Sequence, residues 1–170
     1  MKNKNKKIAL DVDGVLLNFY QGVCEKFNKP YITIDKFDTD WIDEIFPIIE
    51  NDMNFWSNLK QMIPPCGITF DFDYYITALP SQMVGARLHN LVELGYPVKP
   101  IYVSHDKAKL CKGLGVDILI DDKPKTIIEC RKIGVNGILI VPPYFSNDYF
   151  IELNPVRSLD EAKRQFDNEY

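Results

Sequence analysis

Residues 8–16, IALDVDGVL, place two aspartates where a run of apolar residues ends. An apolar run without polar alternation is typical of a strand that is covered on both faces, so residues 6–12 are predicted to form a buried strand. Gly14 follows at once and favours a turn. Asp11 and Asp13 therefore stand at the carboxyl end of a buried strand. Charges in such a place need partners, because burying an isolated carboxylate is costly.

The rest of the chain alternates between strand and helix patterns. Further strands are predicted at residues 73–77, 98–103, 117–120 and 137–141. Helices are predicted at residues 16–27, 81–94, 106–112 and 124–133, and the pair Ser158 and Glu161 indicates the start of a C-terminal helix. This alternation is typical of an α/β protein, a Rossmann-like parallel sheet with helices on both faces. Pro100 favours an edge position or a strand start for the segment 98–103.

The segment between the first two strands differs in character. It is rich in aromatic and acidic residues, and prolines interrupt it. Short helices near 40–46 and 48–60 are expected to form a small helical cap, inserted after the first strand. We therefore expect a core made of residues 1–20 and 66–170 and a cap made of residues 21–65.

Composition excludes several classes of protein. The chain has 170 residues, a net charge of -4 and a pI of about 5.2, which argue against an extended nucleic-acid partner. Its four cysteines show no CxxC spacing, so reduced thiols are expected rather than a zinc site. No leader-like segment and no apolar run of about 20 residues is present, so neither export nor a membrane partner is expected. These features predict a cytoplasmic protein.

Polar residues recur where the predicted strands end. They are Asp11 and Asp13, then Thr77, then Lys107 with Lys109 close by, then Asp121 and Asp122. The carboxyl ends of parallel strands meet at one edge of a sheet, which is where such folds bind ligands. Four carboxylates gathered there would repel one another, and a hard divalent cation with oxygen ligands, Mg2+, would offset the repulsion.

These residue types suit phosphoryl transfer. A carboxylate can attack phosphorus and form an aspartyl phosphate, and a second acid can protonate the leaving group and then activate water. Each residue taken alone also has an ordinary structural interpretation. Asp11 and Asp13 could simply belong to a turn, Thr77 to a strand and Lys107 to the surface. Asp121 and Asp122 could simply favour the start of a helix. Receiver domains of signalling systems use the same ingredients, but with the acidic pair first and the lysine last. The order found here disfavours a receiver domain.

The ordered set resembles the haloacid dehalogenase-like hydrolase superfamily, and within it the phosphatases. The segments DVDGVL (11–16), YIT (75–77), Lys107 and ILIDD (118–122) are similar to its four motifs, and the resemblance covers about residues 6–20 and 70–141. It implies that Asp11 is the nucleophile and that Asp13 is the general acid and base. The phosphatases keep an acid at the position of Asp13, whereas the dehalogenating and ion-pumping branches do not.

The same resemblance implies how phosphate and metal are bound. The phosphoryl group would be bound by Thr77, Ala78 and Lys107. Mg2+ would be held by the Asp11 side chain, the Asp13 main-chain carbonyl and Asp122, with Asp121 either a ligand or a group that orients a bound water.

Three segments are similar to the 5'(3')-deoxyribonucleotidases: DVDGVLLNF (11–19), FWSNLKQMIPPCG (55–67) and SHDKAKLCKGLGVDILIDDKP (104–124). That family has a small helical cap with aromatic residues over the nucleobase, and Phe19, Phe55 and Trp56 occupy the matching positions. Two features depart from it. Only ITFDFD (68–73) lies between Gly67 and the second motif, which is too short for the family's helix. Leu79 stands where several members carry a substrate-binding arginine, a role that Arg87 or Lys109 could take.

The resemblance predicts a Mg2+-dependent phosphomonoesterase acting on a small phosphate ester, most simply a (deoxy)nucleoside monophosphate. Two alternatives stay open at this stage. One is a phosphatase for sugar phosphates or nucleic-acid ends, and the other is a relative that binds phosphate without turnover.

Overall fold

The strand β1 (Ile8–Leu10) lies at the centre of a five-stranded parallel sheet in the computed structural model, which describes residues 6–32, 40–145 and 150–168. The remaining strands are β2 (Tyr74–Thr77), β3 (Ile101–Val103), β4 (Ile118–Asp121) and β5 (Asn136–Leu139). Their order is β3-β2-β1-β4-β5, which confirms the predicted sheet and places β3 at an edge. After β1 the chain adds β2 and then β3 on one side of that strand, and it then adds β4 and β5 on the other side. The carboxyl ends of the neighbours β1 and β4 therefore form the switch point where ligands bind in such sheets.

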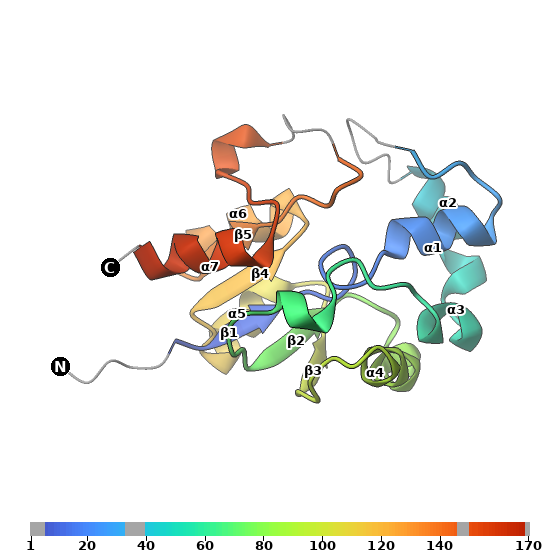
Figure 1. Cartoon of the computed structure of the whole chain (residues 1–170), viewed down its shortest axis with the longest axis horizontal. Coiled ribbons are helices and arrows are strands. Elements are labelled where there is room, and N and C mark those ends of the chain that lie inside the picture. Colours follow the sequence, from blue (N-terminus) through green and yellow to red (C-terminus); the bar gives the residue numbers. More distant parts are fainter. Residues whose placement is uncertain (1–5, 33–39, 146–149, 169–170) are drawn as a thin grey trace.

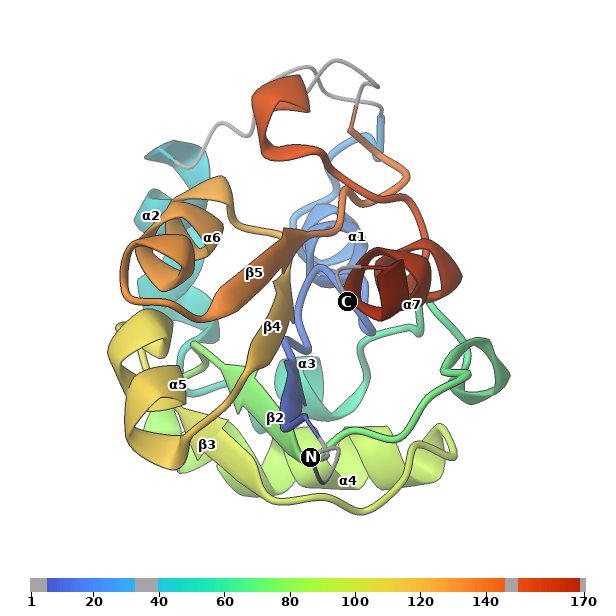
Figure 2. The same ribbon diagram turned by 90° about the vertical axis from the view of Figure 1, so that its left-hand side faces the viewer.

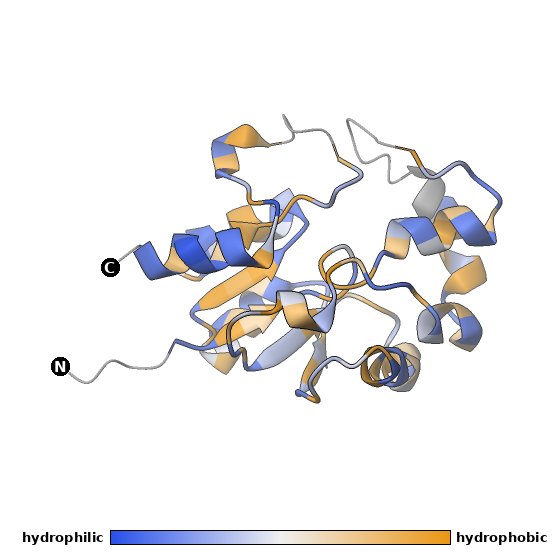
Figure 3. Cartoon of the chain, in the orientation of Figure 1, coloured by the Kyte–Doolittle hydropathy of each residue, from blue (hydrophilic) through white to orange (hydrophobic). Residues whose placement is uncertain are grey.

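Alternate residues of the strands pack on opposite faces of the sheet. Ala9, Ile76 and Leu119 contact a cluster formed with α5 (Lys107–Leu114) and α6 (Pro124–Lys132). Ile8 and Leu10 belong to the larger cluster that includes α4 (Val84–Glu93) and α7 (Leu159–Asn168). Figure 2 shows these two helix layers on either side of the sheet. Figure 3 shows why both layers are needed, since hydrophobic residues occur along the strands themselves.

Three α-helices lie in the described part of the segment between β1 and β2. They are α1 (Phe19–Lys26), α2 (Asp40–Ile49) and α3 (Met53–Ser57), and they lie beyond the carboxyl edge of the sheet (Figure 1). A helical insertion after the first strand was expected at this place. The bounds 21–65 for a separate cap stay a prediction, and residues 33–39 within them lie outside the described part of the chain.

Helix bounds differ from the sequence-based expectation where capping residues decide them. The helix expected at 16–27 begins only at Phe19, because Gly14 has a φ of +84° and the side chain of Asn18 caps the helix by accepting a hydrogen bond from the Gln21 amide. Asp52 likewise caps α3 through the Phe55 amide, so the segment expected at 48–60 is divided between the end of α2 and the short α3.

Short 3-10 turns complete the architecture, at Pro65–Gly67, Ser81–Met83 and Ile151–Leu153. No helix forms between Gly67 and β2, as the length of that segment predicted. The last strand ends at Leu139, before the expected 141, and Ile140 instead bridges to Val156 in the returning C-terminal segment. None of the helices in the described ranges is long and apolar enough to cross a bilayer.

Candidate active site

Asp11 is the first residue after β1 and is almost fully buried. One of its carboxylate oxygens, Oδ1, accepts a hydrogen bond of 2.7 Å from the Val12 amide, and the other, Oδ2, lies 2.6 Å from Lys107 Nζ. The backbone amide of Asp11 donates to the Ile120 carbonyl at 2.9 Å, which ties the residue to the end of β4. Asp11 is therefore held in one orientation at the switch point of the sheet.

Lys107 is the first residue of α5, and its ammonium group joins two strands. Its Nζ lies 2.6 Å from Asp11 and 2.7 Å from Asp121, with only 3% of the side chain exposed. The start of the helix is set by Asp106, whose carboxylate accepts a hydrogen bond from the Lys109 amide. Burial alone lowers the pKa of Lys107, but the carboxylates of Asp11 and Asp121 outweigh it and raise that pKa above its ordinary value. Lys107 therefore remains a cation.

Asp121 and Asp122, at the end of β4, have different environments. Both Asp121 oxygens are engaged, Oδ2 with Lys107 and Oδ1 with the Lys123 amide. Asp122 Oδ1 is buried and, among the described residues, has no hydrogen-bond partner. Asp122 also lies against Gly14, where an added Cβ would come 2.0 Å from Asp122 Oδ2. An unpaired buried carboxylate oxygen points to a missing partner of positive charge.

The acid cluster fits a divalent cation. Asp11, Asp121 and Asp122 each offer an oxygen, and these three oxygens lie within 4.8 Å of one another. Burial, with the neighbouring carboxylate of Asp121 acting in the same direction, raises the pKa of Asp122 to about 7. Burial also raises the pKa of Asp11 well above its ordinary value in spite of the ion pair with Lys107. Three carboxylates around one ammonium leave excess negative charge, which a hard cation with oxygen ligands would neutralise.

Asp13 takes a different set of partners. Its Oδ1 lies 2.6 Å from Nη2 of Arg87, and its Oδ2 accepts a hydrogen bond of 3.3 Å from Thr77 Oγ1. Arg87, on α4, is completely buried and also donates to Asn90 and to the Trp56 carbonyl. Asp13 keeps 19% of its side chain exposed. It is thus fixed beside Asp11 but remains open to the space above it.

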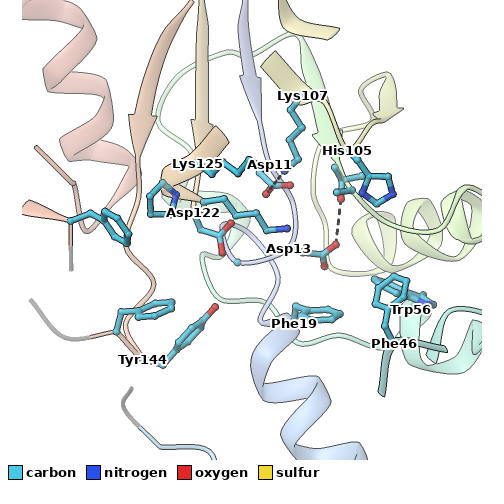
Figure 4. Close-up of a pocket in the computed structure, with 17 residues that line it drawn as sticks. Asp11, Asp13, Phe19, Phe46, Trp56, His105, Lys107, Asp122, Lys125 and Tyr144 are labelled. Carbon is cyan, nitrogen blue, oxygen red and sulfur yellow. Dashed lines mark hydrogen bonds and ion pairs between the residues drawn. The ribbon is translucent and has the colours of Figure 1, made fainter. Parts of the chain in front are cut away.

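A cavity of about 600 Å³ opens over these residues (Figure 4). Its floor contains Asp11, Asp13, Thr77 and Lys107, and Asp122 lies at one side. Ala78 also lines it, whereas Asp121 lies beneath, behind Lys107. The structure therefore brings the four sequence-predicted segments to one cavity.

Aromatic rings line the outer part of the cavity. Phe19 and Trp56 form one wall, stacked with 5.7 Å between ring centroids, and Phe46 packs edge-on against Trp56. Phe55 contacts both Phe19 and Trp56 from behind but does not itself line the cavity. Phe55 thus supports the wall, whereas the resemblance had placed it on the substrate.

Comparisons with known proteins agree on the architecture. A hydrolase of the haloacid dehalogenase-like family from Streptococcus pneumoniae superposes with a TM-score of 0.61 at 15% identity, covering 95% of this chain and 98% of that one. The fold is that of the haloacid dehalogenase-like hydrolases. A second solved structure, described as a dehalogenase, gives a TM-score of 0.56 at 11% identity over 97% of this chain and 98% of its own. The sequence matches no protein-family model and no curated protein.

Within the haloacid dehalogenase-like fold, the basic side chains that line the cavity differ from those expected. Arg87 binds Asp13 and is buried beneath the cavity, and Lys109 lies in a groove between α5 and α6, so neither lines the cavity in place of the missing arginine. His105, Lys123 and Lys125 line it instead. Lys123 and Lys125 flank Pro124 directly after the acidic pair, a signal that the sequence carried in the segment DDKPK.

The opposite wall comes from a part of the chain that carried no motif. Tyr144 and Phe145 follow the last strand, and both line the cavity of this haloacid dehalogenase-like fold. Tyr144 is 4% exposed, and burial, followed by the nearby carboxylate of Asp122, raises the pKa of its hydroxyl well above the ordinary value. The only sequence signal was the Pro142–Pro143 pair, which ends the strand and turns the chain.

Proposed function

We propose that the protein is a Mg2+-dependent phosphomonoesterase that works through an aspartyl phosphate on Asp11, with a nucleoside monophosphate as substrate. The observation that carries the proposal is the arrangement of Asp11, Lys107 and Asp122 beneath one cavity, with a second acid, Asp13, beside the nucleophile. The likeness to solved haloacid dehalogenase-like hydrolases supports this reaction class through the fold.

Asp11 attacks phosphorus in this mechanism. One of its oxygens forms a bond to phosphorus while the bond from phosphorus to the ester oxygen breaks, and the protonated Asp13 gives its proton to the departing oxygen. In the second step Asp13 accepts a proton from water, the water oxygen bonds to phosphorus, and the Asp11–phosphate bond breaks. The Lys107 ammonium, the Thr77 hydroxyl and the Ala78 backbone amide would bind the phosphoryl oxygens.

The acid cluster would hold the metal. Asp11 and Asp122 would contribute carboxylate oxygens and Asp13 its main-chain carbonyl, while Asp121, with both oxygens already engaged, would orient Lys107 and the start of α6. Bound Mg2+ neutralises negative charge on the phosphoryl group and on the carboxylates that surround it. Asp122 Oδ1 is the atom whose lack of a partner supports this assignment.

The walls of the cavity favour a nucleotide over a simple sugar phosphate. A flat nucleobase stacks on aromatic rings, and each such contact is worth about 1–3 kcal/mol. Phe19 and Trp56 provide such rings in the wall of the cavity. They lie on the side toward which the rest of the substrate would extend from its phosphate group on the floor. The acid at position 13 disfavours the dehalogenating branch of the superfamily, which lacks it.

Release of inorganic phosphate tests the proposal. Nucleoside 5'- and 3'-monophosphates, sugar phosphates and 2-haloacids would be compared, each with Mg2+ and with EDTA, for the wild type and Asp11→Asn. Asp71→Asn is a matched control, because Asp71 is an exposed acid remote from the cavity. We expect Mg2+-dependent release from nucleotides, lost in Asp11→Asn and kept in Asp71→Asn.

Three outcomes would contradict the proposal. Activity retained in Asp11→Asn would exclude the covalent mechanism. Faster turnover of sugar phosphates than of nucleotides would reassign the substrate, and halide release from haloacids without any phosphate release would reassign the reaction.

A further inference from the structure

Tyr144 lies across the cavity from the wall formed by Phe19 and Trp56. Its ring packs on Tyr20 of α1 at 4.9 Å between centroids and on Phe145 at 5.2 Å, which anchors it to the body of the protein. Figure 4 shows Phe19 and Tyr144 on opposite sides of the opening, with the Tyr144 oxygen pointing toward Asp122 and Asp13. The ring is therefore fixed, while its hydroxyl faces the place where the ester group must pass.

Buried tyrosine hydroxyls elsewhere in the protein have partners. Tyr75 Oη donates to the Pro97 carbonyl, and Tyr96 Oη is hydrogen-bonded to the carbonyls of Leu16 and Ile63. No described residue forms a hydrogen bond with Tyr144 Oη. A hydroxyl that opens into a polar cavity and has no partner among the described residues is available to a ligand.

We infer that Tyr144 is a specificity-determining residue that contacts the substrate with both parts of its side chain. This inference rests on the proposed function. The ring is the second face of a slot whose first face is Phe19, and the slot holds the flat base of a nucleotide. The hydroxyl donates a hydrogen bond to a sugar oxygen beside the phosphoester. The substrate class is therefore a phosphate ester with a sugar next to the phosphate and a planar ring beyond it.

Two variants separate these two contacts. Tyr144→Phe removes only the hydroxyl, and Tyr144→Leu also removes the ring. Tyr20→Phe is the matched control, because Tyr20 packs on Tyr144 in the same cluster but does not line the cavity. KM and kcat would be measured for a nucleoside 5'-monophosphate, for ribose 5-phosphate and for acetyl phosphate, which has neither sugar nor ring, with melting temperatures recorded for each variant.

The two contacts predict different patterns of KM. Tyr144→Phe should raise KM about fivefold for both the nucleotide and ribose 5-phosphate, the effect of one lost hydrogen bond. Tyr144→Leu should raise KM for the nucleotide a further tenfold or so, with little further change for ribose 5-phosphate. Acetyl phosphate turnover should stay the same in both variants, and Tyr20→Phe should resemble the wild type with all three substrates.

Equal losses with all three substrates would overturn the inference, since a merely structural role acts on every substrate alike. Unchanged KM for the nucleotide in Tyr144→Phe and Tyr144→Leu would overturn it as well. If Tyr144→Leu does not fold, Tyr144→Phe still decides, because it retains the ring and its packing. A wild-type protein that releases phosphate from none of these three compounds would instead contradict the proposed function.

Discussion

At the scale of single residues, the site carries more negative charge than its own cations neutralise. Asp11 and Asp121 share one ammonium group, that of Lys107, and Asp122 beside them has a buried oxygen, Oδ1, without a partner among the described residues. Without a cation, burial and then the neighbouring carboxylate of Asp121 raise the pKa of Asp122 to about 7, so that protonation removes part of this charge. The protein without metal therefore binds a proton more tightly when folded than when unfolded.

A pH-dependent response to Mg2+ follows from this raised pKa. The stability that the proton contributes is present at acidic pH and is lost as the pH rises through about 7. In EDTA, the melting temperature should therefore fall between about pH 5.5 and about pH 8, a range that flanks that pKa. Mg2+ competes with the proton, so the rise in melting temperature on adding Mg2+ should be larger at the upper end of this range than at the lower end.

Asp122→Asn supplies the control for this measurement. The amide carries no charge, so this variant should show a smaller fall in melting temperature in EDTA and a weaker response to Mg2+. A wild-type response to Mg2+ that is equal at both pH values, or one that Asp122→Asn retains in full, would contradict a metal site at Asp122.

Gly14 is the residue that allows Asp122 its position. A Cβ at this position would come 2.0 Å from Asp122 Oδ2, and the φ of +84° is unfavourable for any other residue. Gly14→Ala should lower the free energy of unfolding by about 1–3 kcal/mol and weaken Mg2+ binding by roughly tenfold or more. Urea denaturation and calorimetric titration with Mg2+ measure the two effects.

Gly113→Ala is the matched control for Gly14. Gly113 lies within α5 without a positive φ, and a Cβ added there would meet no atom of the described residues within 4 Å. Alanine should therefore leave Mg2+ binding unchanged and stabilise the helix by up to about 1 kcal/mol. Similar effects of both substitutions would show that the close approach of Gly14 to Asp122 has no special role.

At the scale of elements, α4 connects Asp13 to the helical insertion. Arg87, completely buried in α4, holds Asp13 at 2.6 Å, donates to the Trp56 carbonyl of α3 and places its guanidinium 5.2 Å from the centre of the Trp56 ring. One side chain thus ties the loop after β1, α3 and α4 together. A buried arginine is a costly way to do so unless its charge is paired, as it is here.

Arg87→Met should therefore be destabilising. It leaves Asp13 without its cation, and we expect a loss of about 2–4 kcal/mol in the free energy of unfolding, reduced because Asp13 is partly exposed. Arg164→Met, on the exposed face of α7, should change stability by less than about 0.5 kcal/mol. In a double-mutant cycle, Asp13→Asn should recover part of the loss, whereas strict additivity would show that the two residues are not coupled.

The sequence predicted the order of elements and the floor of the site, but not the supports around it. Asp11, Thr77, Lys107 and Asp122 were predictable because each follows a strand, and parallel strands bring their carboxyl ends together. Arg87 was not predictable as the partner of Asp13, because its place under the site depends on how α4 packs on α3. The start of α1 was missed because the capping by Asn18 overrides an apolar pattern that begins earlier.

At the scale of the whole molecule, the cavity is assembled from segments far apart in the sequence. One wall comes from the insertion after β1 and the other from the chain after β5, with the strand ends between them (Figure 1). Tyr144 could not be assigned to the site from sequence, because no motif surrounds it and packing against other aromatic rings, those of Tyr20, Tyr31 and Phe145, brings it there. Long-range packing of this kind is the part of the site that local patterns do not encode.

Trapping the phosphate on Asp11 tests the covalent mechanism most directly. Asp13→Asn should slow the second step by about 10²–10⁴-fold, because no base then activates the attacking water. An ester with a good leaving group, such as p-nitrophenyl phosphate, needs little help from the acid in the first step. The Asp13→Asn protein would be mixed with this ester, radiolabelled at its phosphate, in the presence of Mg2+ and quenched in acid.

We predict a covalent label on the peptide that contains Asp11, absent in EDTA and absent from the Asp11→Asn, Asp13→Asn double variant. Continued hydrolysis of the ester by Asp13→Asn at an undiminished rate, with no label on the protein, would exclude an aspartyl phosphate on Asp11.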